Sequence, residues 1–167
     1  MRKYIKNLLV CLLFPLFLMS CNSSFINTIK TPFRLVKPSE HFYTDALIRN
    51  LKSSKDITIS IFYPKTGKNK TIPEEYMEKF YLFLDLIEKE DFVRDLHGID
   101  VTSPEYRLTV YINDKSSFII NLLNDRYITI HPWDGSYAPD IIDISSLHTG
   151  NNIFNVVDYL VKNYVKK

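Results

Sequence analysis

Apolar and polar residues alternate in three short runs near the middle of the chain, and this alternation predicts antiparallel strands. The runs are residues 106–112, 117–123 and 126–131. They are separated by Asn113-Asp114-Lys115-Ser116 and by Asn124-Asp125, which are typical of hairpin turns. Strict alternation at 56–61 and a short apolar run at 141–144 predict one or two further strands.

The pairing of these strands follows if the two turns have four and two residues, because directly paired residues share a face of the sheet. One face is then a core side, apolar except for Asn121, and its members are Leu108, Val110, Ile112, Ile119, Ile128 and Ile130. The opposite face and the loop that follows it form a candidate binding surface, which consists of Arg107, Tyr111, Phe118, Tyr127, His131, Trp133 and Tyr137. Tyr and Trp are enriched at interfaces because they bury a large area and keep a polar group. The alternative is that a helix or the loop covers this face as a second core layer.

Segments with helical spacing flank the strands. One spans 40–53, and a second begins with the capping-box pair Thr71 and Glu74 and ends near residue 89. A last helix begins at Asn151 or Asn152, and its apolar stripe is Ile153, Val157, Leu160, Val161 and Tyr164.

The resulting order, α-β-α-β-β-β-(β)-α, predicts an α+β fold. We expect a mainly antiparallel sheet, made of the three-strand meander and one or two further strands, with helices packed on one face. The segment 64–70 is predicted to be a solvated basic loop, because it lacks the glycine spacing of a phosphate-binding loop.

The first twenty residues have the pattern of a secretory signal. Met1 to Asn7 is positively charged, and an apolar run from Leu8 to Met19 follows it. This run is shorter than the roughly 20 residues that a spanning helix needs. An uncleaved N-terminal membrane helix is the alternative interpretation.

The end of this segment, Leu18-Met19-Ser20-Cys21, resembles the lipobox of bacterial lipoproteins. The resemblance implies that Cys21 receives a diacylglyceryl group and becomes the mature N-terminus. Two acyl chains, of palmitate type, hold a protein to a bilayer where one chain exchanges. The expected location is therefore the extracytoplasmic face of the cell membrane, with the membrane bound through the lipid on Cys21.

Composition limits what the mature chain can do. Cys11 lies within the signal and Cys21 carries the lipid, so no thiol remains for a disulfide or a catalytic nucleophile. The signal removes three of the 21 basic residues, which leaves 18 against 19 acidic ones, and nucleic acid is not an expected partner. We predict a signal peptide at 1–20, a lipidated tether at 21–38 and one globular domain at 39–167, although Phe33, Leu35 and Val36 fit an edge strand as an alternative.

Several polar residues around the Trp133 loop invite a chemical interpretation. Asp134, Asp140 and Asp143 are weak candidates for metal ligands, and a hydrolase or metal-dependent enzyme would centre on His131, Asp134 and Asp140. Ser136 is available as a nucleophile but has no nucleophile-elbow motif around it. Asp beside Gly is also common in tight turns, which need no chemistry. We therefore expect no cofactor and favour a protein that is not an enzyme.

The stretch from Ile128 to Gly135, with Trp133-Asp134-Gly135 at its end and Asp140 and Asp143 beyond it, resembles lipoproteins of clostridial-type Gram-positive bacteria. These proteins carry a domain of unknown function. The resemblance implies an exported, lipid-anchored domain and brings no catalytic residues with it. The predicted function is a binding or accessory module for a protein, peptide or wall-glycan partner.

Overall fold

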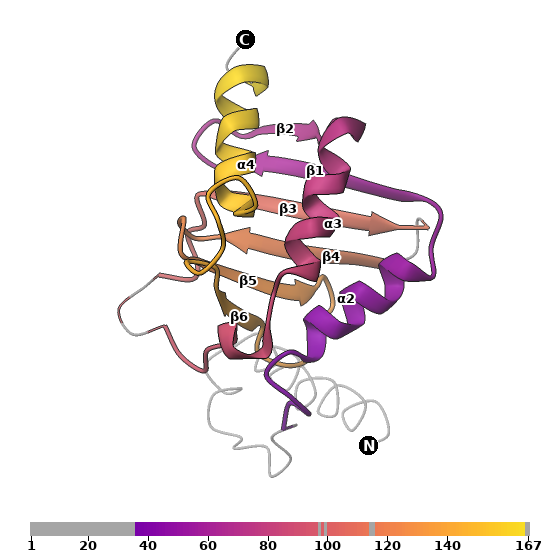
Figure 1. The fold of residues 1–167 in the computed structure, drawn as a ribbon, viewed down its shortest axis with the longest axis vertical. Coiled ribbons are helices and arrows are strands. Elements are labelled where there is room, and N and C mark those ends of the chain that lie inside the picture. Colours follow the sequence, from indigo (N-terminus) through magenta and orange to yellow (C-terminus); the bar gives the residue numbers. More distant parts are fainter. Residues whose placement is uncertain (1–35, 97, 99, 114–115, 166–167) are drawn as a thin grey trace, which may run out of the picture. The chain divides into compact units, whose positions relative to one another are not determined.

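In the part of the chain that the structure describes, six strands form one antiparallel sheet and three α-helices lie across one of its faces (Figure 1). This computed structural model describes residues 36–96, 98, 100–113 and 116–165. They fall within one compact unit, Leu35–Lys167. The predicted α+β class, with helices on one face of an antiparallel sheet, is confirmed.

The helices and strands of the described residues are α2 Phe42–Lys52, β1 Ile57–Tyr63, β2 Lys68–Thr71, α3 Met77–Asp85, β3 Tyr106–Ile112, β4 Ser116–Leu122, β5 Tyr127–Pro132, β6 Asp140–Asp143 and α4 Ile153–Leu160. Short 3-10 turns occupy Glu74–Tyr76 and Lys89–Asp91, and a π-helical turn at Val161–Val165 continues α4. The strand order across the sheet is β2-β1-β3-β4-β5-β6. Figure 1 shows α2, α3 and α4 in front of this sheet.

The core lies between the sheet and the three helices. Its sheet side consists of buried residues on alternate positions, among them Ile59, Ile61, Leu108, Val110, Phe118, Ile120, Leu122, Ile128 and Ile130. The helices contribute Leu47, Leu51, Phe80, Phe83, Leu84, Ile153, Val157 and Leu160. Each large side chain removed from water contributes roughly 1.5–3 kcal/mol, so this single layer accounts for most of the stability of the fold.

The register of the meander differs from the prediction by one residue at both turns. Ile112 pairs with Ser116, which leaves three residues between them rather than four, and Leu122 pairs with Ile128. In the second turn, Leu123 donates its N–H to the carbonyl of Tyr127 at 3.0 Å. Because a shift of one residue moves a strand's side chains to the other face, β4 is turned over relative to the prediction.

The consequence for β4 is a correction of its two faces. Phe118 is only 4% exposed and lies in the core with Ile120 and Leu122, so its predicted place on the binding surface is wrong. Ile119 and Asn121, which were expected on the core side, lie on the opposite face. The face predictions for β3 and β5 are correct, because alternation within one strand does not depend on the turns.

The segment 64–71 also differs from the prediction. The chain turns at residues 64–67, with Gly67 at a φ of 66°, and returns as β2 on the edge of the sheet. Thr71 is the last residue of this strand, so it does not form the predicted capping box with Glu74. The 3-10 turn that leads into α3 instead follows Pro73.

The last helix begins at Asn152, which is one of its two predicted start positions. The side-chain oxygen of Asn152 accepts hydrogen bonds from the N–H groups of Phe154 and Asn155, at 3.0 and 3.4 Å. Its amide nitrogen donates to the carbonyl oxygens of Asp125 and Ile144. Asn152 is therefore both the N-cap of α4 and a link to the second turn and β6.

The signal segment, Cys21 and most of the predicted tether lie outside the described residues. Val36 has no regular secondary structure and is 84% exposed, and Lys37 follows it with a contact described below. None of the helices in the described ranges combines the length and the apolar character that crossing a bilayer demands.

Candidate functional site

The sheet face turned away from α2, α3 and α4 carries four residues of the predicted binding surface. Arg107 and Tyr111 come from β3, and Tyr127 and His131 come from β5. Tyr111 is 44% exposed, and the other three are half-buried. The three described helices all pack on the opposite side, so none of them makes this face a second core layer (Figure 1).

A row of polar side chains crosses the middle of this open face. Arg107 donates from Nε to Oδ1 of Asn121 at 3.0 Å, and Nδ2 of Asn121 donates to Oγ1 of Thr129 at 3.2 Å. The three residues are directly paired across β3, β4 and β5. Asn121 and Thr129 are buried, so their hydrogen bonds satisfy polar groups that would otherwise be costly to remove from water. The bond to Asn121 also restrains the Arg107 side chain.

Trp133 lies just beyond β5 and is 73% exposed. Its backbone N–H donates to the carbonyl of Ser117 at 3.0 Å, and the N–H of Gly135 donates to the carbonyl of Pro132 at 3.1 Å. The turn is therefore hydrogen-bonded on both sides of the exposed indole. A large aromatic side chain on an ordered turn is a favourable anchor for a partner, because little conformational entropy is lost on binding.

Tyr137 packs the loop onto α2 and does not contribute to an exposed binding surface. The Tyr43 hydroxyl accepts a hydrogen bond from the Tyr137 N–H at 2.7 Å, and the Tyr137 ring lies against those of Phe42 and Tyr43. A Cβ on Gly135 would come within 3.0 Å of the Tyr43 hydroxyl, so the loop packs closely onto α2. The exposed part of the candidate surface is thus Trp133 with Tyr111.

Asp140 is a fully buried carboxylate on the helix side of the sheet. Its Oδ2 accepts hydrogen bonds from the N–H and the hydroxyl of Thr44, at 2.6 and 2.8 Å. The Lys37 ammonium lies 2.6 Å from Oδ1, in a geometry that gives an ion pair but not a regular hydrogen bond. Thr44 is in the first turn of α2, so Asp140 acts as the cap that the side chain of His41 does not supply.

The residues of the enzyme hypothesis do not meet in one place. Asp140 is paired with Ile130 and shares its core face, whereas the neighbouring His131 side chain lies on the open face. Asp134 is exposed in the Trp133 turn, and Asp143 pairs with Arg126 at 2.9 Å. Within the described residues, no group of three or more His, Cys, Asp or Glu side chains is placed to hold a metal ion.

The Asp143 carboxylate is nevertheless electrostatically perturbed. Its partial burial opposes ionisation, but hydrogen bonds from Ser145 and Arg126 outweigh that effect and lower the pKa below the ordinary value of 3.8. The Arg126 guanidinium also lies over the Tyr127 ring at 4.8 Å. These contacts indicate that Asp143 stabilises the edge of the sheet.

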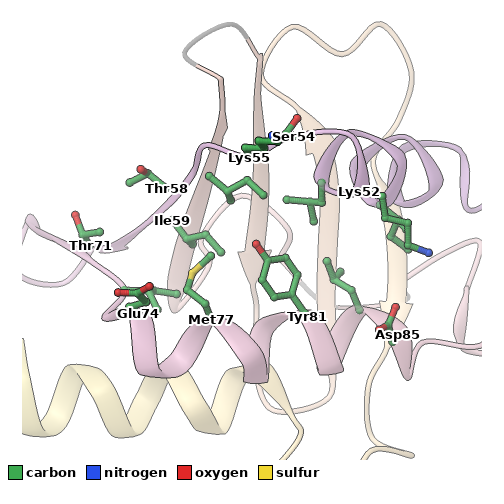
Figure 2. Close-up of a pocket in the computed structure, with 15 residues that line it drawn as sticks. Lys52, Ser54, Lys55, Thr58, Ile59, Thr71, Glu74, Met77, Tyr81 and Asp85 are labelled. Carbon is green, nitrogen blue, oxygen red and sulfur yellow. The ribbon is translucent and has the colours of Figure 1, made fainter.

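A groove that the sequence did not indicate lies between the end of α2, β1 and α3, and its volume is about 690 Å³ (Figure 2). Its floor is apolar and consists of Ile48, Leu51, Ile59, Ile72, Met77 and Leu84. Tyr81 rises from α3 toward the middle of the groove in Figure 2, and burial raises the pKa of its hydroxyl. Its residues come from three separate elements, which is why no local motif predicted it.

The fold and the site define a small α+β domain in which helices cover one face of the sheet and no described helix covers the other. The family described as "Domain of unknown function (DUF4883)" matches residues 37–157, and the chain belongs to this family. The crystal structure of a "Putative Lipoprotein from Clostridium perfringens" is similar, with a TM-score of 0.67 and 17% identity. The match covers 77% of this chain and 100% of that one, and it shows that the two share a fold. No curated protein has a similar sequence.

Proposed function

We propose that this chain is an extracytoplasmic lipoprotein, held at the cell membrane by lipid on Cys21, and that its domain binds an envelope partner without catalysing a reaction. The lipobox-like sequence ending at Cys21 supports the anchor. The fold shared with a protein described as a lipoprotein is consistent with it. The partner is a protein, a peptide or a wall glycan.

The observation that carries the binding role is the exposed indole of Trp133 on a hydrogen-bonded turn. Tyr111 adds a second exposed ring at the same end of the sheet. Tyr111 is paired with Ser117, and the Trp133 N–H donates to the Ser117 carbonyl, so both residues lie beside Ser117. Arg107 and His131 add polar groups on the same face. Surfaces that combine ordered aromatic rings with a few polar groups are typical of recognition sites.

Replacement of the lipid-bearing cysteine tests the anchor. In a Gram-positive host, the wild-type protein should sediment with membranes, and Cys21→Ala should move to the soluble or secreted fraction because the acyl chains are lost. Cys11→Ala is the matched control and should stay with the membrane. A Cys21→Ala protein that remains in the membrane fraction contradicts the lipid anchor.

Affinity capture from envelope extracts, together with sedimentation on isolated cell walls, tests the binding surface. Trp133→Ala should weaken binding by about 30-fold, as expected for loss of a hot-spot tryptophan. Tyr159→Ala is the matched control, because Tyr159 is a 54% exposed aromatic residue on α4, away from this surface. Both variants should keep the wild-type melting temperature. Equal binding by Trp133→Ala and wild type would refute the proposed surface.

A further inference from the structure

The strand β1 extends beyond its edge neighbour and leaves a short open edge beside the groove. β3 pairs with β1 from Ile57 to Phe62, whereas β2 pairs with it only from Ser60 to Tyr63. After Thr71 the chain turns away, and its last bond to β1 is from the Ile72 N–H to the Ile59 carbonyl at 2.8 Å. No other strand of the described chain continues along this edge past Ile59.

The open edge offers backbone hydrogen-bonding groups. Along an antiparallel strand, the N–H and C=O groups of successive residues point to alternate sides. Because the Ile59 carbonyl points toward β2, the N–H and C=O of Ile57 point in the same direction, past the end of β2. Ile57, Thr58 and Ile59 all line the groove, so this edge forms part of its wall.

The rim of the groove carries two positive and two negative side chains. Lys52 and Lys55 come from the end of α2 and the connection to β1, and Glu74 and Asp85 come from the ends of the α3 segment (Figure 2). All four are exposed, and the salt bridges formed among the described residues include none of them. The rim therefore carries no net charge. Lys52 lies toward one end of α3, near Asp85, and Glu74 lies toward the other end, so a ligand that carries both charges meets an opposite charge at each end (Figure 2).

We propose that this groove binds a short peptide in extended conformation, which adds as a strand to the Ile57–Ile59 edge of β1. The peptide places an apolar side chain on the floor formed by Leu51, Ile59 and Met77. Its carboxylate faces Lys52 and Lys55, and its ammonium faces Glu74. Strand addition supplies affinity through main-chain hydrogen bonds, and the pocket supplies specificity through the side chain.

The size and the charges of the groove favour a peptide over other amphipathic ligands. A volume of about 690 Å³ lies within the range of roughly 300–1,000 Å³ that is typical of small-ligand sites. A fatty acid would satisfy the apolar floor and the lysines, but it would leave Glu74 without a cationic partner and would not use the strand edge. This site is separate from the Trp133 surface and goes beyond the binding role proposed for it.

Calorimetry and amide chemical shifts test this proposal on the full chain carrying Cys21→Ala. The probe is the tripeptide Leu-Val-Leu with free ends. It should bind and shift the Ile57 and Ile59 amide signals, and N-methylation of both its amides should abolish binding, because strand pairing then fails. Capping both ends should weaken binding by about tenfold, and decanoate should bind no better than the capped peptide.

Variants of the groove complete the test. Lys52→Gln with Lys55→Gln should weaken the tripeptide by about tenfold, whereas Lys79→Gln with Lys89→Gln, two exposed lysines elsewhere on the α3 side, should leave affinity unchanged. Trp133→Ala should also leave it unchanged, which separates this site from the proposed envelope-binding surface. The proposal is overturned if the tripeptide fails to bind at millimolar concentration, if the methylated peptide or decanoate binds equally well, or if the shifted amides lie outside the groove.

Discussion

Asp140 and Thr44 are 96 residues apart, yet one carboxylate oxygen of Asp140 accepts both the N–H and the hydroxyl of Thr44. The carboxylate comes from the first residue of β6 and reaches the first turn of α2. The partial positive charge at the start of α2 stabilises this buried anion, and Lys37 neutralises it from the other side. A strand at one edge of the sheet thus fixes the position of the first described helix.

Replacement of this carboxylate should destabilise the domain. Asp140→Asn removes the charge from hydrogen bonds to Thr44 and leaves Lys37 without its partner, so we expect a loss of about 2–3 kcal/mol in the free energy of unfolding. Urea unfolding measures it. Asp45→Asn is the control on the same helix, because Asp45 pairs with His41 near the surface, and it should cost less than about 1 kcal/mol. Similar losses in the two variants would contradict the capping role.

The cap of α4 can be tested with two adjacent asparagines. Asn152→Ala removes the hydrogen bonds to the N–H groups of Phe154 and Asn155, and two further bonds to carbonyl groups. We expect a loss of about 1–2 kcal/mol in thermal or urea unfolding. Asn151→Ala should change stability by less than about 0.5 kcal/mol, because its side chain caps nothing. A larger effect at Asn151 would mean that the helix begins one residue earlier.

The register of β4 predicts opposite outcomes for two aromatic residues. Phe118→Ala should cost about 3–5 kcal/mol, because Phe118 is in the core. Tyr111→Ala should cost less than about 1 kcal/mol, because its ring is largely exposed on the open face. Urea unfolding of both variants distinguishes this register from the four-residue turn, in which Phe118 and Tyr111 would be neighbours on one surface and would respond alike.

The Asp143 carboxylate should make stability depend on pH in the acid range. Its folded-state pKa is lowered, so it contributes stability above the unfolded-state value near 3.8, and this contribution is lost as the pH falls through the folded-state pKa. Asp143→Asn should therefore lower stability at neutral pH, by less than about 1 kcal/mol because Arg126 is mostly exposed.

The same comparison at low pH provides the check. As the pH falls through the folded-state pKa, the difference in stability between the wild-type protein and Asp143→Asn should shrink, because the carboxyl group becomes protonated in both folded and unfolded chains. Asp134→Asn is the control, since the exposed Asp134 forms no ion pair with a described residue. A difference between wild type and Asp143→Asn that persists at the lower pH would exclude the proposed cause.

The meander illustrates what alternation can and cannot predict. Within β3 and β5, apolar and polar residues alternate clearly, so their core faces followed from the sequence. β4 is apolar on both faces, and its pattern cannot report a shift of one residue. Asn121 was the one informative residue in β4. On the predicted core face its amide would be buried without a partner, which is costly, whereas the observed register gives it Arg107 and Thr129 as partners.

The parts of the site that the sequence missed depend on contacts between distant segments. Nothing near Asp140 indicates that its partner is Thr44, so a structural carboxylate resembled a metal ligand. β2 consists of Lys68, Asn69, Lys70 and Thr71, which have no apolar alternation, and its strand forms only because β1 offers an edge to pair with. The groove beside β2 could not be predicted either, because its lining residues come from segments that are far apart in the sequence.

The outer edges of the sheet differ in how readily they accept another chain. Lysines on β2 discourage a second sheet from joining there, and Phe92 and Val93 already bond to β6 at the other end. The groove beside Ile57 is lined by residues of α2 and α3 as well as β1, so the proposed strand addition there involves a single extended peptide rather than the edge of a second sheet. Under the proposed lipid anchor and the proposed peptide site, neighbouring copies of this domain on one membrane would remain separate molecules while each captures an unstructured chain.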